Sequence, residues 1–418
     1  MNTLRVAVFH NLPSGGAKRA LHSHMRLLHK MGHKLDLYNL TTSEEGFVPL
    51  APFAEDVFTF PLNWTPPRPR ANLAVRLANL SRLASVCEMI AERIDNGQYD
   101  VAFVHHCRFV QSPLLLSRLK TPSVYYCEEP LRRLYEPPLT PYELNRPASW
   151  GRTLYRRYIL SLADRVHDRV LKTLERRNVQ SANLVLANSY YSRETLYRTF
   201  QVDASVNYLG VDAVSFRPLN MRKENWVLSV GALHPRKAHD FVIRALSLIR
   251  ARIRPRLVVV ADRGAAAEAY LKAYATAHGV DLKILLRVSD DELVELYNRA
   301  EAMVYAPLLE PFGLAALEAM ACGTPVIGVK EAGIRETVRS GETGILTERS
   351  EEDFAQALET LLLNKESAHT MGRQARSYVS RAWTWERSTE ELVRNFHRAV
   401  NRAAKRVKPR TATQSTQG

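Results

Sequence analysis

Residues 305–329 read YAPLLEPFGLAALEAMACGTPVIGV, and this stretch decides the fold of the second half of the chain. A short apolar run ends in a loop at Glu310, a helix opens at Phe312-Gly313, and a second apolar run follows the helix. Strand, helix and parallel strand in this order form the unit of a doubly wound sheet. Glu318 follows Glu310 by eight positions, so one carboxylate precedes the helix and the other lies about two turns along it.

The loop and the helix start together predict a site for phosphate groups and sugar hydroxyls. The first N–H groups of a helix have no partner within it and lie at the positive end of its dipole, which attracts anions. Gly313 lets the backbone approach a ligand closely. We therefore expect Glu310, Phe312, Gly313 and Leu314 at a binding edge. Two solvated helix acids are the alternative interpretation of Glu310 and Glu318.

Strand-like and helix-like segments alternate along nearly the whole chain, and the apolar strands are almost continuous. The predicted strands are residues 4–10, 34–40, 56–60, 99–105, 122–127, 183–189, 225–231, 256–262, 282–288, 302–307 and 324–329. Such strands are typical of parallel sheets covered by helices on both faces. The sequence predicts an α/β protein with two doubly wound domains, residues 1–210 and 211–385. A C-terminal helix and a basic, partly disordered tail are expected over residues 386–418.

Composition limits the class of protein. The 418 residues carry 58 Lys and Arg against 43 Asp and Glu, a net charge of +15. A basic surface suits phosphates in nucleic acid, in lipid headgroups or in a diphosphate ligand, and charge alone does not choose between them. No apolar run reaches the roughly 18 residues that cross a bilayer. The four cysteines lack C-x-x-C spacing and the N-terminus lacks a signal-peptide pattern, so we expect buried free thiols and a cytoplasmic protein.

The stretch at 305–329 resembles the donor-binding signature of the family-four retaining glycosyltransferases, also called glycosyltransferase group 1. That signature has two glutamates separated by seven residues, with P-F-G after the first and E-A-M-A-x-G-x-P-V from the second, and all of it stands here. The resemblance implies the GT-B fold, in which two Rossmann-like domains face each other across a cleft. It also implies that Glu310 contacts the donor sugar and that Glu318 holds the nucleotide ribose.

Residues 229–246, SVGALHPRKAHDFVIRAL, are similar to the S-V-G-R-L-x-x-x-K-G loop of the same family. By this resemblance Lys237 neutralises the donor diphosphate and also acts in catalysis. Ala232 stands where the family has an arginine, which removes a charge-assisted contact worth about 1.5–3 kcal/mol. Arg236 and Arg5 are the candidates to supply the missing charge.

In the first domain, Gly15 and Gly16 follow the first predicted strand and resemble the Gly-Gly loop that contacts the donor phosphate in the family. Two glycines that only form a turn are the alternative interpretation.

The segment PSVYYCEEPLRRLYEP, residues 122–137, resembles the Y-C-H-x-P-x-R pattern of some relatives, whose histidine lies near the reacting anomeric carbon. Glu128 takes the place of that histidine, and it is expected to orient a sugar hydroxyl, to accept a proton, or to be inert. His105 and His106 end a predicted strand and are further catalytic candidates for the same cleft. Ordinary packing is the alternative for this histidine pair.

Residues 146–177 carry nine Lys and Arg against three acids, with apolar residues at helical spacing. Either this helix has a solvated basic face, or it meets an anionic membrane or a lipid-diphosphate acceptor.

Taken with the absence of a D-x-D triplet, the resemblance implies a metal-independent, cofactor-free retaining hexosyltransferase. Its donor would be a UDP- or GDP-sugar, and its acceptor a glycan, lipid-linked or small-molecule hydroxyl, as in polysaccharide biosynthesis. Binding of nucleic acid is not expected, because the chain lacks a recognition helix or an aromatic strand motif. Two alternatives stay open. One is a catalytically silent protein that binds a nucleotide sugar, and the other is a GT-B enzyme of another reaction type, such as a phosphorylase or an epimerase.

Overall fold

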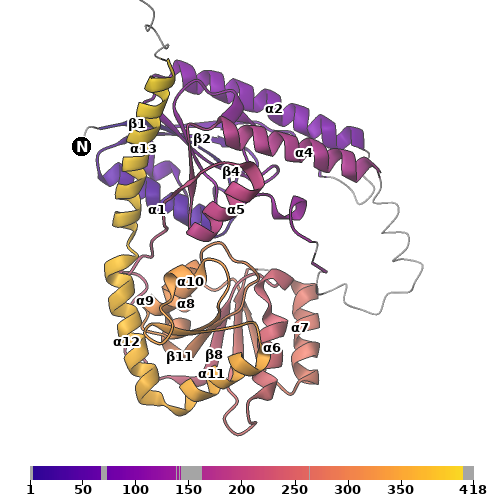
Figure 1. Ribbon diagram of the computed structural model, residues 1–418, viewed down its shortest axis with the longest axis vertical. Helices are drawn as coiled ribbons and strands as arrows, with labels where there is room; N and C mark the ends of the chain where they lie inside the picture. The colour runs from indigo at the N-terminus through magenta and orange to yellow at the C-terminus, as the bar shows by residue number, and fades with distance from the viewer. Residues whose placement is uncertain are drawn as a thin grey trace, which may run out of the picture.

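The protein is described by a computed structural model that covers residues 3–66, 73–137, 139–140, 142, 162–262 and 264–407. Two α/β domains lie one above the other along the long axis of the molecule (Figure 1). The strands of the first domain are β1 (Arg5–Asn11), β2 (Lys34–Leu40), β3 (Asp56–Phe60), β4 (Val101–Cys107), β5 (Ser123–Tyr126), β6 (Leu184–Ala187) and β7 (Ser205–Val206). Those of the second are β8 (Glu224–Val230), β9 (Arg256–Ala261), β10 (Leu282–Leu286), β11 (Ala300–Tyr305), β12 (Val326–Val329) and β13 (Gly344–Thr347).

Each domain is built on one parallel sheet. The strand order is β3-β2-β1-β4-β5-β6-β7 in the first and β10-β9-β8-β11-β12-β13 in the second. In both, the order reverses beside the first strand of the domain, and ligands of open α/β sheets bind at such switch points. All eleven predicted strands are present. The prediction missed β7, which has two residues, and β13, which begins at Gly344 without a long apolar run.

Helices cover both faces of the sheets. Those of the first domain are α1 (Gly16–Lys30), α2 (Leu73–Asn96), α4 (Leu162–Ser181) and α5 (Tyr190–Phe200), with short 3-10 turns η1 (Ala51–Phe53), η2 (Leu114–Ser117) and η3 (Arg132–Leu134). Those that follow are η5 (Pro235–Lys237), α6 (His239–Leu248), α7 (Ala265–Ala277), α8 (Asp290–Arg299), α9 (Leu314–Ala321), α10 (Ile334–Thr337), α11 (Glu351–Leu363), α12 (Lys365–Ala382) and α13 (Trp385–Val407). The helix α8 begins with a capping box that Ser289 and Glu292 form.

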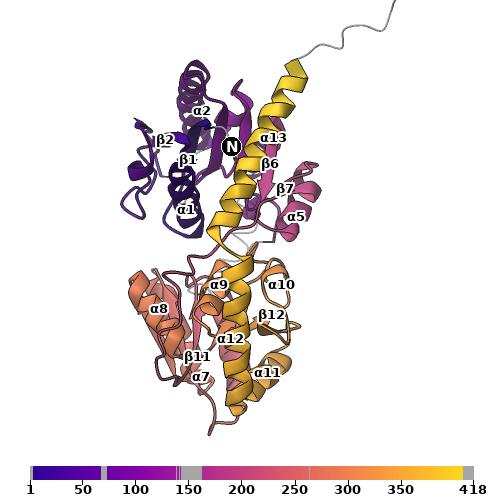
Figure 2. The ribbon, with the colours of Figure 1, turned by 90° about the vertical axis from the view of Figure 1, so that its left-hand side faces the viewer.

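The last helix returns to the first domain. After α12, which lies along the second domain, α13 crosses the junction and packs beside α1 and on β4, β5 and β6 (Figure 2). Alternation along β1 places Val6 and Val8 in the core under α1 and α13, and Ala7 and Phe9 in the opposite core under α2. Residues after 385 therefore complete the first domain, although they follow the second in sequence.

The chain passes between the domains twice at one point. A Cβ atom at Gly210 would lie 2.4 Å from the backbone nitrogen of Trp385, so the two crossings can touch only because residue 210 has no side chain. Elsewhere the four cysteines are buried with free thiols, as predicted. Within the described ranges, no helix is long and apolar enough to cross a membrane.

Candidate functional site

A cavity of about 370 Å³ lies where the carboxyl ends of the two sheets face each other. Segments far apart in sequence form its walls: the start of α1, the residues after β5, the η5 turn and the loop between β11 and α9. Eight residues predicted from the sequence line it, namely Gly16, Glu128, Arg236, Lys237, Glu310, Phe312, Gly313 and Leu314. The structure thus brings together most of the predicted site.

Lys237 and Glu310 form the central ion pair of the wall in the second domain. The ammonium Nζ of Lys237 donates to both carboxylate oxygens of Glu310, at 2.8 and 2.7 Å. About a quarter of each side chain is exposed, so both groups can still reach a ligand. The backbone fixes Glu310, because its carbonyl accepts a hydrogen bond from the N–H of Gly333 at 3.0 Å. A Cβ at Gly333 would lie 2.1 Å from the carbonyl oxygen of Pro311, which excludes any larger residue there.

Two helix N-termini open into the same cavity. The helix α9 begins after Gly313, whose φ of 95° lies in the left-handed region, and a Cβ there would lie 3.1 Å from the hydroxyl of Tyr305. The helix α1 begins at Gly16, in the opposite wall. Among the described residues, neither helix has a side-chain cap or an acid in its first turn. Their free N–H groups and dipoles therefore favour an anion between them.

Glu318 lies in a second, adjoining cavity of about 260 Å³, which shares Leu314 with the first. Its side chain is almost buried, and its Oε2 accepts a hydrogen bond from the hydroxyl of Tyr297 at 3.0 Å. Burial raises the pKa of Glu318 to about 7, an effect that the nearby Arg19 opposes. A polar group that enters this cavity meets a carboxylate with one oxygen still free to accept.

The wall in the first domain carries two adjacent acids, Glu128 and Glu129. Burial, and then the charges of Glu129 and Glu310, raise the pKa of Glu128 to about 8. Burial also raises the pKa of Glu129 to about 7, although Arg132 opposes the shift. Within the part of the chain that the structure describes, Oε1 of Glu128 is shielded from solvent and has no hydrogen-bond partner.

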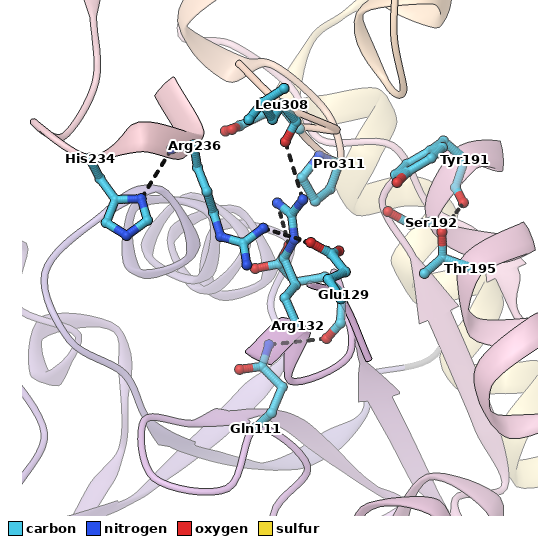
Figure 3. Close-up of polar contacts among 12 residues, drawn as sticks. Gln111, Glu129, Arg132, Tyr191, Ser192, Thr195, His234, Arg236, Leu308 and Pro311 are labelled. Atoms are coloured by element: carbon cyan, nitrogen blue, oxygen red, sulfur yellow. Dashed lines mark hydrogen bonds and ion pairs between the residues drawn. The ribbon is translucent and has the colours of Figure 1, made fainter. Parts of the chain in front are cut away.

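A charged network next to these acids joins the two domains (Figure 3). Glu136 of the first domain accepts from Arg132 at 2.7 Å and from Arg236 of the second domain at 2.6 Å. Arg132 also donates to the carbonyl of Leu308 at 3.1 Å and lies 3.6 Å from Glu129. Arg236 therefore lines the cavity as predicted, but Glu136 engages its guanidinium.

Four further predicted positions lie outside both cavities, namely His105, His106, Gly15 and Arg5. His105 is fully buried and stacks face to face on Tyr126, with ring centroids 5.3 Å apart. Burial also lowers the pKa of His106, to about 4, so both imidazoles are neutral and neither reaches the cavity. The prediction that these two histidines lie in the cleft is therefore wrong. Gly15 lies just outside the lining, as the residue before α1.

Arg5 does not supply the missing charge either. Its guanidinium donates to the carbonyl of Gly97 and to Asp36 at the start of β1. That is the amino edge of the parallel sheet, whereas the cavity lies beyond the carboxyl edge, so this expectation was wrong.

Further contacts hold the two domains together around the cavity. Glu336 of α10 accepts from the backbone N–H groups of Tyr190 and Tyr191, at 2.9 and 3.0 Å, and from the hydroxyl of Tyr208 at 2.8 Å. It therefore caps helix α5 across the domain boundary. On the other side of the cleft, Arg19 of α1 makes two hydrogen bonds to Asp290 of α8, at 2.8 and 2.6 Å.

Sequence reasoning missed Glu129, Arg132, Glu136 and Glu336. For two of them a signal existed: Glu129 follows Glu128 directly, and Arg132 stands at the arginine of the Y-C-H-x-P-x-R pattern. Nothing in the local sequence shows that Glu136 or Glu336 joins the domains, because Arg236 is 100 residues from Glu136 and Tyr190 is 146 residues from Glu336.

The predicted basic segment is described only in part, since residues 146–161 lie outside the described residues. The helix α4 covers the rest and exposes five cations, namely Arg165, Arg169, Lys172, Arg176 and Arg177. Its apolar residues Val170 and Leu174 pack against the core. Among the described residues, no three His, Cys, Asp or Glu side chains are grouped so that they could hold a metal ion.

Two family models match the chain in adjoining segments. The model described as "Glycosyltransferase Family 4" matches residues 14–214, and "Glycosyl transferases group 1" matches residues 212–378. Together they cover both walls of the cavity.

Known relatives and solved structures agree with this match. The D-inositol 3-phosphate glycosyltransferase of Geodermatophilus obscurus is 32% identical over 269 residues, which span 59% of this chain and 59% of that protein. Sucrose-phosphate synthase from Thermosynechococcus elongatus superimposes with a TM-score of 0.69 at 20% identity, over 94% of this chain and 98% of that one. The Anabaena protein HepE, solved with UDP-glucose, gives 0.68 at 18% identity, over 94% and 99%. The fold is GT-B, as predicted.

Proposed function

The chain belongs to the glycosyltransferase group 1 family, and on that premise we propose that it moves a hexose from a nucleotide-diphosphate sugar to a hydroxyl acceptor. The donor is a UDP- or GDP-sugar, and the structural neighbour solved with UDP-glucose makes UDP-glucose the first candidate. The transfer retains the configuration of the sugar and needs no metal ion. The acceptor is a glycan, a lipid-linked sugar or a small molecule.

The observation that carries the proposal is the Lys237–Glu310 ion pair between two uncapped helix N-termini. A diphosphate in this cavity meets one mobile cation and two sets of free backbone N–H groups, which together compensate its charge. Glu310 lies beside that position, where a carboxylate can accept hydrogen bonds from sugar hydroxyls.

The same groups act more strongly as the reaction proceeds. When the bond between the anomeric carbon and the phosphate oxygen breaks, negative charge grows on the nucleotide diphosphate and positive charge on the sugar ring. Lys237 and the helix N-termini stabilise the first, and Glu310 stabilises the second. In a retaining transfer the acceptor attacks from the side of the leaving group, so a donor phosphate oxygen can take the acceptor proton. The mechanism then needs no protein nucleophile.

The nucleoside extends into the cavity of Glu318. The shared lining residue Leu314 supports this, because it places the two cavities side by side at the start of α9. The free oxygen of Glu318 accepts a hydrogen bond from a ribose hydroxyl there, while Tyr297 holds the other oxygen in place.

Four free, buried cysteines suit a reducing compartment, which supports the cytoplasm as the place of action. The five exposed cations of α4 support a peripheral contact with anionic lipid. Such a contact weakens as salt is raised, because it depends on the surface charge of the membrane.

Calorimetry with UDP, GDP and their glucose and mannose conjugates, followed by assays of transfer and of donor hydrolysis, tests the proposal. We expect the chain to bind one of these donors with EDTA present and to turn it over. Lys237→Ala should weaken both binding and turnover, whereas Lys283→Ala, which removes an exposed lysine of β10, should change neither. A strict need for Mg²⁺ or Mn²⁺ would contradict the metal-free mechanism. Binding without turnover of any donor would favour the silent binding protein.

A further inference from the structure

Among the described residues, the acceptor side of the cavity holds one more carboxyl group than its cations can balance, and Glu128, with its raised pKa, is mostly protonated at pH 7. Three carboxylates converge there, and two of them have a cation: Glu310 pairs with Lys237, and Glu129 lies 3.6 Å from Arg132. Among the described residues Glu128 has none, since the ionisable groups that perturb its pKa are the acids Glu129 and Glu310. Its Oε1 is enclosed by protein and lacks a hydrogen-bond partner among the described residues.

The two arginines of the wall do not correct this imbalance. Glu136 accepts hydrogen bonds from both Arg132 and Arg236, at 2.7 and 2.6 Å. A fourth carboxylate therefore shares the positive charges of these two arginines. When Lys237 pairs with a donor diphosphate, two further negative charges enter the cavity. Glu310 then shares the positive charge of Lys237 with the phosphates. A buried carboxylate without a partner costs free energy until a donor group or a cation satisfies it.

We infer that the acceptor carries a protonated amino group close to its attacking hydroxyl, and that this ammonium binds between the carboxylates of Glu128 and Glu129. The inference rests on the proposed function, because it assigns the acceptor of that same cavity. Amino sugars and aminocyclitols share the required chemistry, namely an ammonium on the carbon beside a hydroxyl of a six-membered ring.

An ammonium fits this wall better than the other two charge states of an acceptor. It offers three N–H donors to two carboxylates and restores neutrality in a partly buried site, where charge-assisted bonds are strongest. A neutral acceptor leaves the carboxyl group of Glu128 without a positively charged partner. An anionic acceptor adds a like charge beside a diphosphate and three acids. The relatives named for D-inositol 3-phosphate act on an anionic acceptor, so this site departs from theirs.

The test measures how acceptor charge alters binding to the full-length chain saturated with UDP, or with GDP where GDP binds more tightly. The probes are two amine–hydroxyl pairs, glucosamine with glucose and scyllo-inosamine with scyllo-inositol, together with D-inositol 3-phosphate. We expect at least one amine to bind about tenfold more tightly than its hydroxyl partner at pH 7, the ratio that one charge-assisted hydrogen bond produces. Tighter binding of the sugar amine would indicate an amino sugar as the acceptor, and tighter binding of the cyclitol amine would indicate an aminocyclitol. Equal or undetectable binding of both amines, or tighter binding of the phosphate, overturns the inference.

Variants of the two acids test whether Glu128 and Glu129 cause the preference for an amine. Glu128→Gln and Glu129→Gln should each reduce the amine-to-hydroxyl ratio several-fold, whereas Glu92→Gln, which removes an exposed charge from α2, should retain it. A ratio that survives both cavity variants contradicts the assignment even if the amine binds well. The nucleotide titration that precedes each experiment separates the two proposals. A chain that binds no nucleotide refutes the glycosyltransferase function, and one that binds nucleotide without preferring an amine refutes only the ammonium site.

Discussion

The two walls of the cavity differ in how their charges are balanced. In the second domain, Lys237 and Glu310 neutralise each other within one ion pair, and the backbone around Gly313 and Gly333 can hold only glycine. In the first domain, Glu128 and Glu129 lie side by side and have raised pKa values. The nearby arginines donate hydrogen bonds to Glu136. One wall is internally complete, and the other lacks a positive charge.

On the proposed function, this difference follows from what each wall binds. Every donor of a nucleotide-diphosphate type presents the same two phosphates, which a lysine and two helix N-termini can bind in this cavity. Acceptors have no common charge or shape, and the wall that meets them must differ among relatives. Most family residues are accordingly present in the wall of the second domain, where Ala232 replaces one arginine, whereas Glu128 replaces the family histidine in the first.

The largest effect is expected when the ion pair of Lys237 and Glu310 in the second domain is broken. Glu310→Gln keeps the shape of the side chain but removes the charge that stabilises the sugar ring, so turnover should fall on the order of a hundredfold. Nucleotide affinity should stay the same or rise slightly, because Lys237 loses its competing partner. Steady-state kinetics and UDP calorimetry measure the two effects. Glu268→Gln, which breaks a 2.7 Å ion pair with Lys272 on α7, is the matched control. Near-normal turnover would mean that the two-glutamate signature is only structural here.

The second prediction separates the two cavities. Glu318→Ala should weaken nucleotide binding by about tenfold or more, the value of one charged hydrogen bond to a ribose hydroxyl, and should change the rate at saturating donor much less. Tyr297→Phe removes only the group that orients Glu318, so its effect should be smaller. Unchanged UDP affinity in Glu318→Ala would show that the nucleoside binds elsewhere.

A third prediction tests whether the walls must be held together. Glu336→Ala removes three hydrogen bonds that join α10 to the first domain, and kcat/KM should fall about tenfold because the loop at Glu310 is less firmly placed. Solution scattering should show a more open chain. Glu336→Gln, which can still accept from one or two of these donors, should recover part of the activity. Glu342→Gln lies close in sequence on an exposed turn and should behave as the parent does. A loss of folding stability without a change in kcat/KM would limit Glu336 to a structural role.

The last prediction concerns stability and not activity, and it is a gain of stability in the unbalanced wall. Burial raises the pKa of Glu128 from its ordinary value near 4.5 to about 8. As the pH rises from 4.5 to 8, the unfolded chain releases this proton before the folded chain does, so the folded state loses stability across that window. Glu128→Gln removes the penalty and should stabilise the protein by up to about 4 kcal/mol at pH 8, and by nothing at pH 4.

Thermal unfolding of parent and variant at the two pH values measures this gain. Glu92→Gln, with an exposed acid, should show no such dependence. An equal change in Tm at pH 4 and pH 8 would mean that Glu128 is not held in its neutral form. Glu129 and Glu318 titrate in the same window, but they are present in both proteins and largely cancel in the difference.

Much of the fold was predictable because it is written in local pattern. Apolar runs predicted eleven strands, and all of them are present. The prediction failed where the pattern is short or depends on distant partners. The strand β7 has two residues, and the return of α13 to the first domain depends on the close approach of Gly210 to Trp385.

The sequence by itself determined the parts of the site that lie within one loop and the helix after it, such as Glu310, Gly313 and Glu318, because spacing along a helix fixes their relative positions. Only the tertiary structure decided which charges are compensated. It buried His105 in the core, paired Arg236 with Glu136, and left Glu128 without a cation among the residues that the structure describes. Burial and the distance to other charges set the state of an ionisable group, and both depend on segments that meet only after the chain has folded.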